Sequence, residues 1–257
     1  MGPALTLLHA IARPVIRKLR GPPRVGAGRA LDNGSIAERT VDGTAVRWLI
    51  TNAGDDIQSA QLRDGFYELA DLRRLAEDVG PVRTVLDVGA NIGNHAVFFT
   101  AMMGVKELVL IEPFSEAADH LMVNLALNSS NIQTVILHRC ALGASEGTAS
   151  LFPPTEFNIG LTRVEFHDHG QGEVRVATGD QLKFSTLDLL KIDVEGTEME
   201  VLRGLENTIR THKPAIYLET SRETRQTAVS FLKSLSYRLH RAAEAYETQF
   251  NLTFLAN

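Results

Sequence analysis

The stretch Val85-Leu86-Asp87-Val88-Gly89-Ala90-Asn91-Ile92-Gly93-Asn94 decides the fold of this chain. It begins with an apolar run that ends in an acid, passes through two glycines and continues into a segment with helical spacing. Glycine lets the backbone turn tightly and approach a ligand closely. A strand, a glycine turn and a helix in this order are typical of ligand sites at the carboxyl ends of parallel strands.

Outward from this stretch, short apolar runs alternate with helical patterns. Such alternation predicts an α/β, doubly wound, mostly parallel sheet with crossover helices. Two closing runs, 237–241 and 249–255, are too close for a helical crossover, so they should pair antiparallel. The expected strands are 84–88, 107–111, 134–138, 187–194 and 215–218, and the expected helices are 62–77, 94–103, 116–128, 198–210 and 222–235.

The chain divides into a basic N-terminal extension and linker, residues 1–40, and one domain, residues 41–257, with an inserted loop at 153–172. Residues 1–30 hold six basic and no acidic residues, with apolar residues between them at helical spacing. Three interpretations remain open for this segment: a bland extension, a targeting peptide, or a peripheral membrane contact. Apart from a possible membrane contact through this segment, the sequence predicts a cytoplasmic protein.

Composition excludes several classes of protein. The 257 residues are 44% hydrophobic and carry a net charge of −5, which is ordinary for a globular chain. Removing the six positive charges of residues 1–30 leaves −11 for the remainder, so we expect no nucleic-acid partner. The single cysteine, Cys140, cannot form an intramolecular disulfide.

The glycine turn also indicates the kind of cofactor. Its spacing is G-x-x-x-G rather than the G-x-G-x-x-G that cradles a pyrophosphate, and Asp87 would repel phosphates. A cofactor with cationic groups and no phosphate fits better, and S-adenosylmethionine, with an ammonium and a sulfonium, has this chemistry. Glu112 ends the next strand, where a carboxylate can accept both ribose hydroxyls.

A third charged element lies where a buried strand should be apolar. Lys191 and Asp193 point to the same face of the strand at 187–194 because side chains alternate with a period of two. A structural ion pair and a catalytic pair are both consistent with this placement.

Together these segments resemble the FkbM family of S-adenosylmethionine-dependent methyltransferases. The resemblance extends from about residue 41 to 254 and rests on Leu86-Asp87-Val88-Gly89-Ala90-Asn91-Ile92-Gly93, Ile111-Glu112-Pro113 and Leu190-Lys191-Ile192-Asp193-Val194-Glu195-Gly196-Thr197-Glu198. It implies a Rossmann-like, class I methyltransferase sheet of seven strands with an antiparallel C-terminal strand. The implied acceptor is a small-molecule, glycan or glycolipid hydroxyl.

The resemblance also implies roles for single residues. One group would line the methionine and adenosine side of the cofactor: Asp87, Gly89, Asn91 and Gly93. Glu112 would hold the ribose and Glu68 the polar end of the cofactor, while Cys140 and Ala141 would lie near the adenine.

Methyl transfer to a hydroxyl needs a base. We expect Asp193 in that role because it ends the fourth strand, with Lys191 orienting it and with Glu195 and Glu219 as further candidates. Glu165, His167, Asp168 and His169 are interpreted as a solvated loop rather than a metal site, and no metal is expected. His95 is interpreted as structural.

Two other functions remain as alternatives. A nicotinamide-dependent oxidoreductase would explain the strand–turn–helix segment, but it normally uses the pyrophosphate-binding spacing that this chain lacks. A non-catalytic module with the same fold would not need acids at positions 87, 112 and 193.

Overall fold

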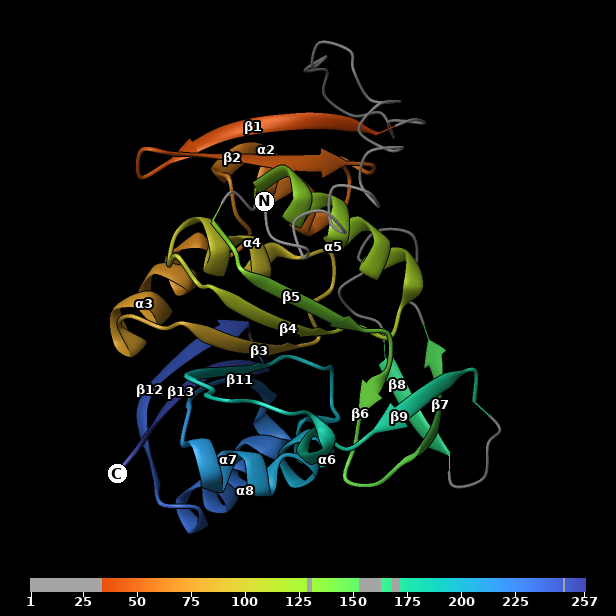
Figure 1. Cartoon of the computed structure of the whole chain (residues 1–257), viewed down its shortest axis with the longest axis vertical. Coiled ribbons are helices and arrows are strands. Elements are labelled where there is room, and N and C mark those ends of the chain that lie inside the picture. Colours follow the sequence, from red (N-terminus) through yellow and green to blue (C-terminus); the bar gives the residue numbers. More distant parts are fainter. Residues whose placement is uncertain (1–33, 129–130, 153–162, 168–171, 247) are drawn as a thin grey trace.

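The computed structural model describes residues 34–128, 131–152, 163–167, 172–246 and 248–257. Seven strands of this described chain form the central sheet (Figure 1), in the order β12 (Tyr237–Tyr246), β13 (Gln249–Ala256), β11 (Ala215–Ser221), β10 (Leu189–Ile192), β3 (Thr84–Val88), β4 (Glu107–Ile111) and β5 (Thr134–His138). Six of them run in the same direction, and β13 runs antiparallel to both of its neighbours, β11 and β12. The predicted fold class and the antiparallel closing pair are confirmed.

The strand order reverses between β3 and β10, because the chain builds outward from β3 to β5 and later returns to β10 and β11. Ligand sites of open α/β sheets lie outside the carboxyl ends of the strands at such a reversal. The stretch that decides the fold, at the end of β3, therefore borders this position.

Helices cover both faces of the sheet (Figure 1). Buried side chains of α4 (Asn94–Ala101) and α5 (Ser115–Asn128) pack with Val85 and Leu108 on one face. On the other face, Leu86 and Leu190 pack against α6 (Glu198–Gly204), α7 (Glu206–His212) and α8 (Arg222–Ser234). Successive strand residues thus enter different cores, which explains why the strands read as continuous apolar runs.

Two expected helices are each divided in two. The segment 62–77 forms α2 (Asp56–Asp64) and α3 (Leu69–Val79), because Gly65 between them adopts φ +88° and approaches Val41 too closely for a Cβ. The segment 198–210 forms α6 and α7. Gly204 ends α6 at a point where a Cβ would lie 2.0 Å from the carbonyl oxygen of Gly143.

An antiparallel hairpin precedes these helices. It pairs β1 (Ser35–Val41) with β2 (Thr44–Ile50), and β2 is tied to α5 by a hydrogen bond from Leu49 N to Asn124 Oδ1 (2.8 Å). β1 therefore begins within the segment 1–40 that the sequence assigns to the N-terminal extension and linker. Residues 1–33 lie outside the described part of the chain.

Part of the expected loop at 153–172 is a strand. Residues 163–167 form β8 (Arg163–His167), which pairs with β7 (Gly147–Phe152) in a second sheet ordered β6 (Ala141–Leu142), β9 (Val174–Ala177), β7 and β8. Val164 and Phe166 pack on Ala149, and two apolar residues are too short a pattern to recognise in sequence. A 3-10 turn, η2 (Gly179–Gln181), follows β9. Residues 153–162 and 168–171 are outside the described residues.

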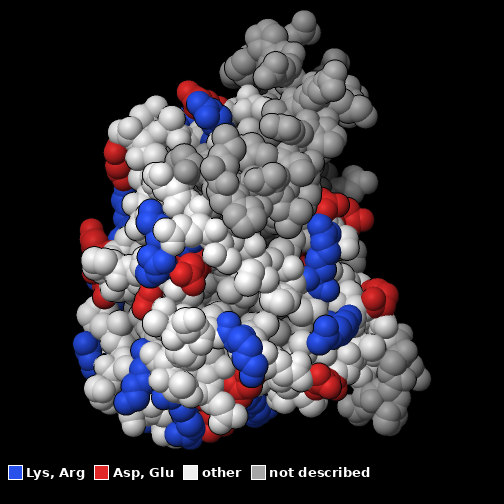
Figure 2. Space-filling view, in the orientation of Figure 1, with Lys and Arg blue, Asp and Glu red and all other residues white. Residues whose placement is uncertain are grey.

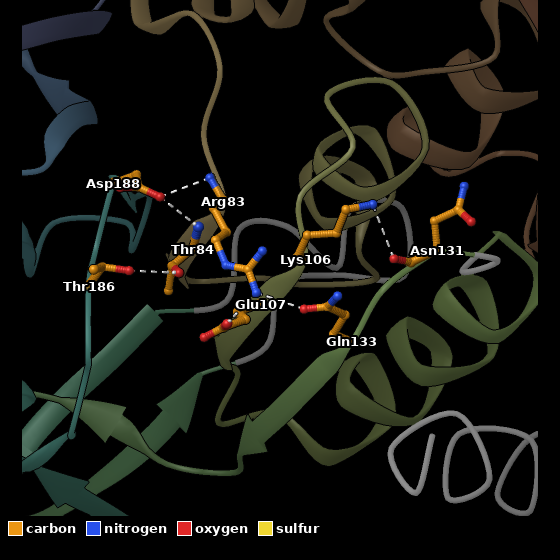
Figure 3. Close-up of polar contacts among 8 residues, drawn as sticks. All are labelled: Arg83, Thr84, Lys106, Glu107, Asn131, Gln133, Thr186 and Asp188. Atoms are coloured by element: carbon orange, nitrogen blue, oxygen red, sulfur yellow. Dashed lines mark hydrogen bonds and ion pairs between the residues drawn. The ribbon is translucent and has the colours of Figure 1, made fainter. Parts of the chain in front are cut away.

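At the end of the sheet opposite the glycine turn, hydrogen bonds link the amino ends of the parallel strands. Figure 3 shows Asp188, before β10, accepting hydrogen bonds from the backbone nitrogens of Arg83 (2.8 Å) and Thr84 (2.9 Å), at the start of β3. The Arg83 guanidinium in turn contacts Glu107 and Gln133, before β5. The face in Figure 2 shows basic and acidic side chains interspersed.

Candidate active site

A cavity of about 240 Å³ lies at the carboxyl ends of β3, β10 and β11. The structure brings six of the predicted site residues together on its wall: Glu68, Gly89, Asn91, Lys191, Asp193 and Glu195. Tyr67, His95, Glu219 and Gln249 also line it. This is the edge of the sheet at which the strand order reverses.

Gly89 shapes the floor of this cavity. Its φ is +78°, and a Cβ at this position would lie 1.8 Å from the carbonyl oxygen of Asp193. Only glycine allows β3 and β10 to approach this closely, and the resulting turn is held by a hydrogen bond from Gly89 N to Ile111 O (3.0 Å). Gly93 also has positive φ, +90°, and starts α4 against Leu121 rather than lining the cavity.

Lys191 is the central cation of the site. Its Nζ donates to Gly89 O (2.7 Å) and lies 3.1 Å from Asp87 Oδ1 and 3.3 Å from Asp193 Oδ2. Burial by itself would lower the pKa of this ammonium, but the two neighbouring carboxylates raise it well above its usual range. The ammonium therefore stays charged and joins the glycine turn to both acids.

Glu112 closes the glycine turn from the neighbouring strand. One carboxylate oxygen accepts from Asn91 N (2.7 Å) and the other from Phe114 N (2.8 Å). Burial raises the pKa of this carboxyl to about 7, against the lowering effect of the two backbone donors. Glu112 does not line the cavity in this structure.

Three other predicted residues also lie off the cavity wall. Asp87 is fully buried beneath it, on the same sheet row as Lys191 and Tyr217. Cys140 and Ala141 follow β5 and are buried among apolar side chains. Of the residues predicted to hold the cofactor, Glu68, Gly89 and Asn91 thus lie on the cavity wall, and the others lie off it.

Several buried polar atoms near the cavity have no hydrogen-bond partner within the described chain. They include Asp87 Oδ2, Asn91 Oδ1, His95 Nε2 and the Tyr217 hydroxyl. Buried polar groups in folded proteins are nearly always paired with protein, water or ligand. Unpaired acceptors beside a glycine turn and a row of acids fit a cationic, donor-bearing ligand, which is the chemistry of S-adenosylmethionine.

His95 was missed by sequence reasoning as a residue of the cavity. It is 9% exposed, and its ring lies between Phe99 and Tyr217, with centroids 6.1 Å away from each. Burial and the charge of Lys191 lower its pKa well below the usual value, so the imidazole is neutral. A histidine near a helix start carries no signal in sequence that separates this location from an ordinary surface position.

A second cavity, of about 460 Å³, adjoins the first. The two share four lining residues: Asp193, Glu195, Glu219 and Gln249. Burial raises the pKa of Glu195 to about 7, with a further contribution from the charge of Asp193. Burial, Asp193 and Glu68 together raise the pKa of Glu219 well above its usual range. The shared wall is thus acidic and partly protonated.

The expected metal-free loop is tested only in part. Glu165 and His167 lie on β8 instead of in a loop, and His167 Nε2 contacts Ser150 Oγ (2.9 Å). Asp168 and His169 lie outside the described residues. Over the ranges that the structure describes, no three His, Cys, Asp or Glu side chains are grouped as metal ligands would be.

Over the same ranges, no helix is both long and apolar enough to cross a membrane.

Comparisons with known proteins agree with this geometry. A family model described as "Methyltransferase FkbM domain" matches residues 87–239. The hexuronic acid methyltransferase AglP of Haloferax volcanii is 30% identical over 186 residues, which are 71% of this chain and 72% of that protein. Methyltransferase sdnD of Sordaria araneosa is 29% identical over 156 residues, 48% of this chain and 60% of its own length.

A crystal structure of a methyltransferase FkbM from Methylobacillus flagellatus is also similar. It is 16% identical, with a TM-score of 0.45, and the match covers 77% of this chain and 52% of that one. The family model covers more than half of the present chain, and AglP is similar over most of both lengths. The chain therefore belongs to the FkbM family of S-adenosylmethionine-dependent methyltransferases.

Proposed function

We propose that this chain is an O-methyltransferase that methylates a sugar hydroxyl, free or within a glycan or glycolipid. The observation that carries the proposal is the wall shared by the two cavities, where Asp193, Glu195 and Glu219 present carboxyl groups to both sides. Methyl transfer needs donor and acceptor in line, so two adjoining cavities with a base between them suit this reaction.

The donor would be held by residues on two sides of the glycine turn. In this proposal, Gly89 and Asn91 face the methionine and adenosine parts, and Asp87 beneath the turn and Gly93 at the start of α4 support this side of the site. Glu112 accepts from the ribose hydroxyls, Cys140 and Ala141 lie near the adenine, and Glu68 binds the polar end. The raised pKa of Glu112 is consistent with a carboxyl that gains donors when a ligand binds.

S-adenosylmethionine supplies a methyl group from its sulfonium: the sulfur–carbon bond breaks as the acceptor's oxygen–carbon bond forms, and S-adenosylhomocysteine leaves. Asp193 takes the hydroxyl proton in this proposal. Its carboxylate lies 3.3 Å from Lys191 Nζ and remains 28% exposed, so it is both oriented and reachable from the cavity. Glu195, held near Gln249 Nε2 (3.4 Å), is the second candidate base.

A sugar acceptor is supported by two observations. AglP is, by its name, a hexuronic acid methyltransferase. The wall of the second cavity consists mainly of carboxyl, hydroxyl and amide side chains, which match a ligand rich in hydroxyl groups. Family membership also favours transfer of a methyl group over the hydride chemistry of a nicotinamide enzyme.

The test is transfer of radiolabelled methyl from S-adenosylmethionine to sugars by the full chain and by Asp193→Asn. The substitution keeps the shape but removes the base, so we expect turnover to fall by about 10²–10⁴ with little change in S-adenosylhomocysteine affinity. Asp188→Asn, at the opposite end of β10, is the matched control. Unchanged turnover in Asp193→Asn would exclude it as the base, and absence of label in any sugar would contradict the proposed acceptor.

Peripheral membrane contact through residues 1–30 remains a prediction from their six positive charges and apolar stripe. Sedimentation with anionic vesicles at low salt decides it. Full-length protein that stays in the supernatant would exclude the contact.

A further inference from the structure

The second cavity has an uneven distribution of charge. Five acidic side chains line it: Asp193, Glu195, Glu198, Glu219 and Glu223. Among the described residues that line this cavity, one is positively charged: Arg163, an exposed residue at the start of β8. Carboxyl groups therefore dominate the wall that receives an acceptor, and one positive charge stands against those of them that are ionised.

Hydroxyl groups on the same wall do not offset this bias. The Thr224 hydroxyl is already bonded to those of Thr220 (2.7 Å) and Ser221 (3.0 Å). The Thr197 hydroxyl donates to Val194 O (3.1 Å). These hydroxyls already bond within the protein, so the carboxyl groups are the main polar groups that the wall offers to a ligand.

Glu198 shows this need most clearly. Its side chain lines the cavity from the start of α6, yet the residue is only 3% exposed. One carboxylate oxygen accepts from Gly196 N (2.6 Å), whereas Oε2 makes no well-formed hydrogen bond among the described residues, with the Thr224 hydroxyl as the donor beside this carboxyl. A buried acceptor without a donor is rare in folded proteins, and a bound hydroxyl would supply the missing donor.

We propose that the acceptor is an uncharged sugar, that Glu198 recognises one of its hydroxyls, and that the cavity rejects sugars carrying a carboxylate or phosphate. The inference rests on the proposed function and narrows its substrate class. An anionic substituent would meet the negative charge of those carboxyl groups that are ionised, which is unfavourable, and it would offer no donor to Glu198 Oε2. In this respect the chain differs from AglP, whose name specifies a hexuronic acid.

The experiment compares matched sugars. Transfer of the labelled methyl group is measured with methyl glycosides of glucose, galactose and mannose and with the corresponding uronic acids. Binding of the same compounds to the complex of the protein with S-adenosylhomocysteine is followed by ligand-observed NMR. We expect kcat/KM for a neutral sugar to exceed that of its uronic acid by at least about tenfold, because like charges face each other in the second case.

Two variants assign the selectivity to Glu198. Glu198→Gln places an amide where the unpaired oxygen lies, so KM for the neutral sugar should rise about 10- to 100-fold while S-adenosylhomocysteine affinity stays constant. Glu200→Gln makes the same charge change two residues along α6, at an exposed pair with Arg203, and should alter neither value. If Glu198→Gln does not fold, Glu198→Asp keeps the charge but withdraws the oxygen, and should raise the same KM.

Methylation of the uronic acids that equals or exceeds that of the neutral sugars would overturn the inference. Loss of a preference for uronic acids in Arg163→Gln would show that Arg163 binds their carboxylate instead. An unchanged KM in the folded Glu198 variants would overturn the role of that residue. If the protein binds S-adenosylhomocysteine but no sugar of either charge accepts a methyl group, the proposed function fails and this inference falls with it.

Discussion

Lys191 and Asp87 form an ion pair beneath the glycine turn, with Nζ 3.1 Å from Oδ1 and with side-chain exposures of 1% and 0%. The pair joins the two strands at which the sheet order reverses, β10 and β3, at directly opposed positions. The same lysine lies 3.3 Å from Asp193 Oδ2. A structural and a catalytic role for Lys191 and Asp193, the alternatives that the sequence left open, are both compatible with this geometry.

Lys191→Met should destabilise the fold by about 3–5 kcal/mol, because it leaves the Asp87 carboxylate buried without its cation. The double variant Asp87→Asn with Lys191→Met should recover part of that loss, since neither partner is then charged. Denaturant unfolding followed by circular dichroism measures both. Arg47→Met, at an exposed pair with Glu38, serves as the control and should cost under about 1 kcal/mol. A single variant as stable as the control would mean that the buried pair does not hold the turn.

Gly89→Ala should be far more costly than Gly43→Ala. The two glycines share nearly the same φ, +78° and +79°, but a Cβ at 89 meets Asp193 O at 1.8 Å while one at 43 meets nothing within 4 Å. Gly43→Ala should lower the free energy of unfolding only by the cost of a left-handed backbone at alanine, about 1–2 kcal/mol. In Gly89→Ala the clash should lower the free energy of unfolding by a further 1–3 kcal/mol or so. The same substitution should weaken S-adenosylhomocysteine binding. Equal melting temperatures for the two variants would contradict the close strand approach.

Glu112→Ala should weaken S-adenosylhomocysteine binding by about 1.5–3 kcal/mol, the scale of hydrogen bonds to a charged group. Isothermal titration calorimetry provides the measurement. Glu107→Ala, at the amino end of the same strand and paired with Arg83, should leave the affinity unchanged. An affinity that Glu112→Ala does not alter would remove Glu112 from the cofactor site.

The pKa of Glu195 predicts how stability depends on pH. Burial raises it from 4.5 to about 7 in the folded protein, so between these values the folded state binds more protons than the unfolded state. The contribution of Glu195 to stability is complete below about pH 4.5 and is lost as the pH rises through about 7. The loss is below about 4 kcal/mol, since one pKa unit corresponds to about 1.4 kcal/mol.

Glu195→Gln should flatten this part of the profile, measured as the free energy of unfolding at pH 5 and pH 7.5. Glu206→Gln is the control, because Glu206 lies in an exposed pair with Arg210 on α7. A wild-type protein that gains stability across this range relative to Glu195→Gln would reverse the predicted sign and contradict the raised pKa.

The sequence by itself determined the parallel core and its turn. Alternation of apolar runs with helical patterns is a local property, so β3, β4 and β5 were predicted with the bounds that the structure shows. Acids at strand ends were equally visible, and parallel strands place such ends at one edge, so Lys191, Asp193 and Glu195 were expected near Gly89 and are found there.

Only the tertiary structure decided which distant residues complete the site. His95 and Gln249 join the cavity through helix packing and the pairing of β11 with β13, neither of which leaves a local pattern. The same is true of β8, whose start brings Arg163 to the second cavity through pairing with β7. Spacing along a chain reports periodicity within one element, whereas the position of one element against another depends on close packing of the whole core.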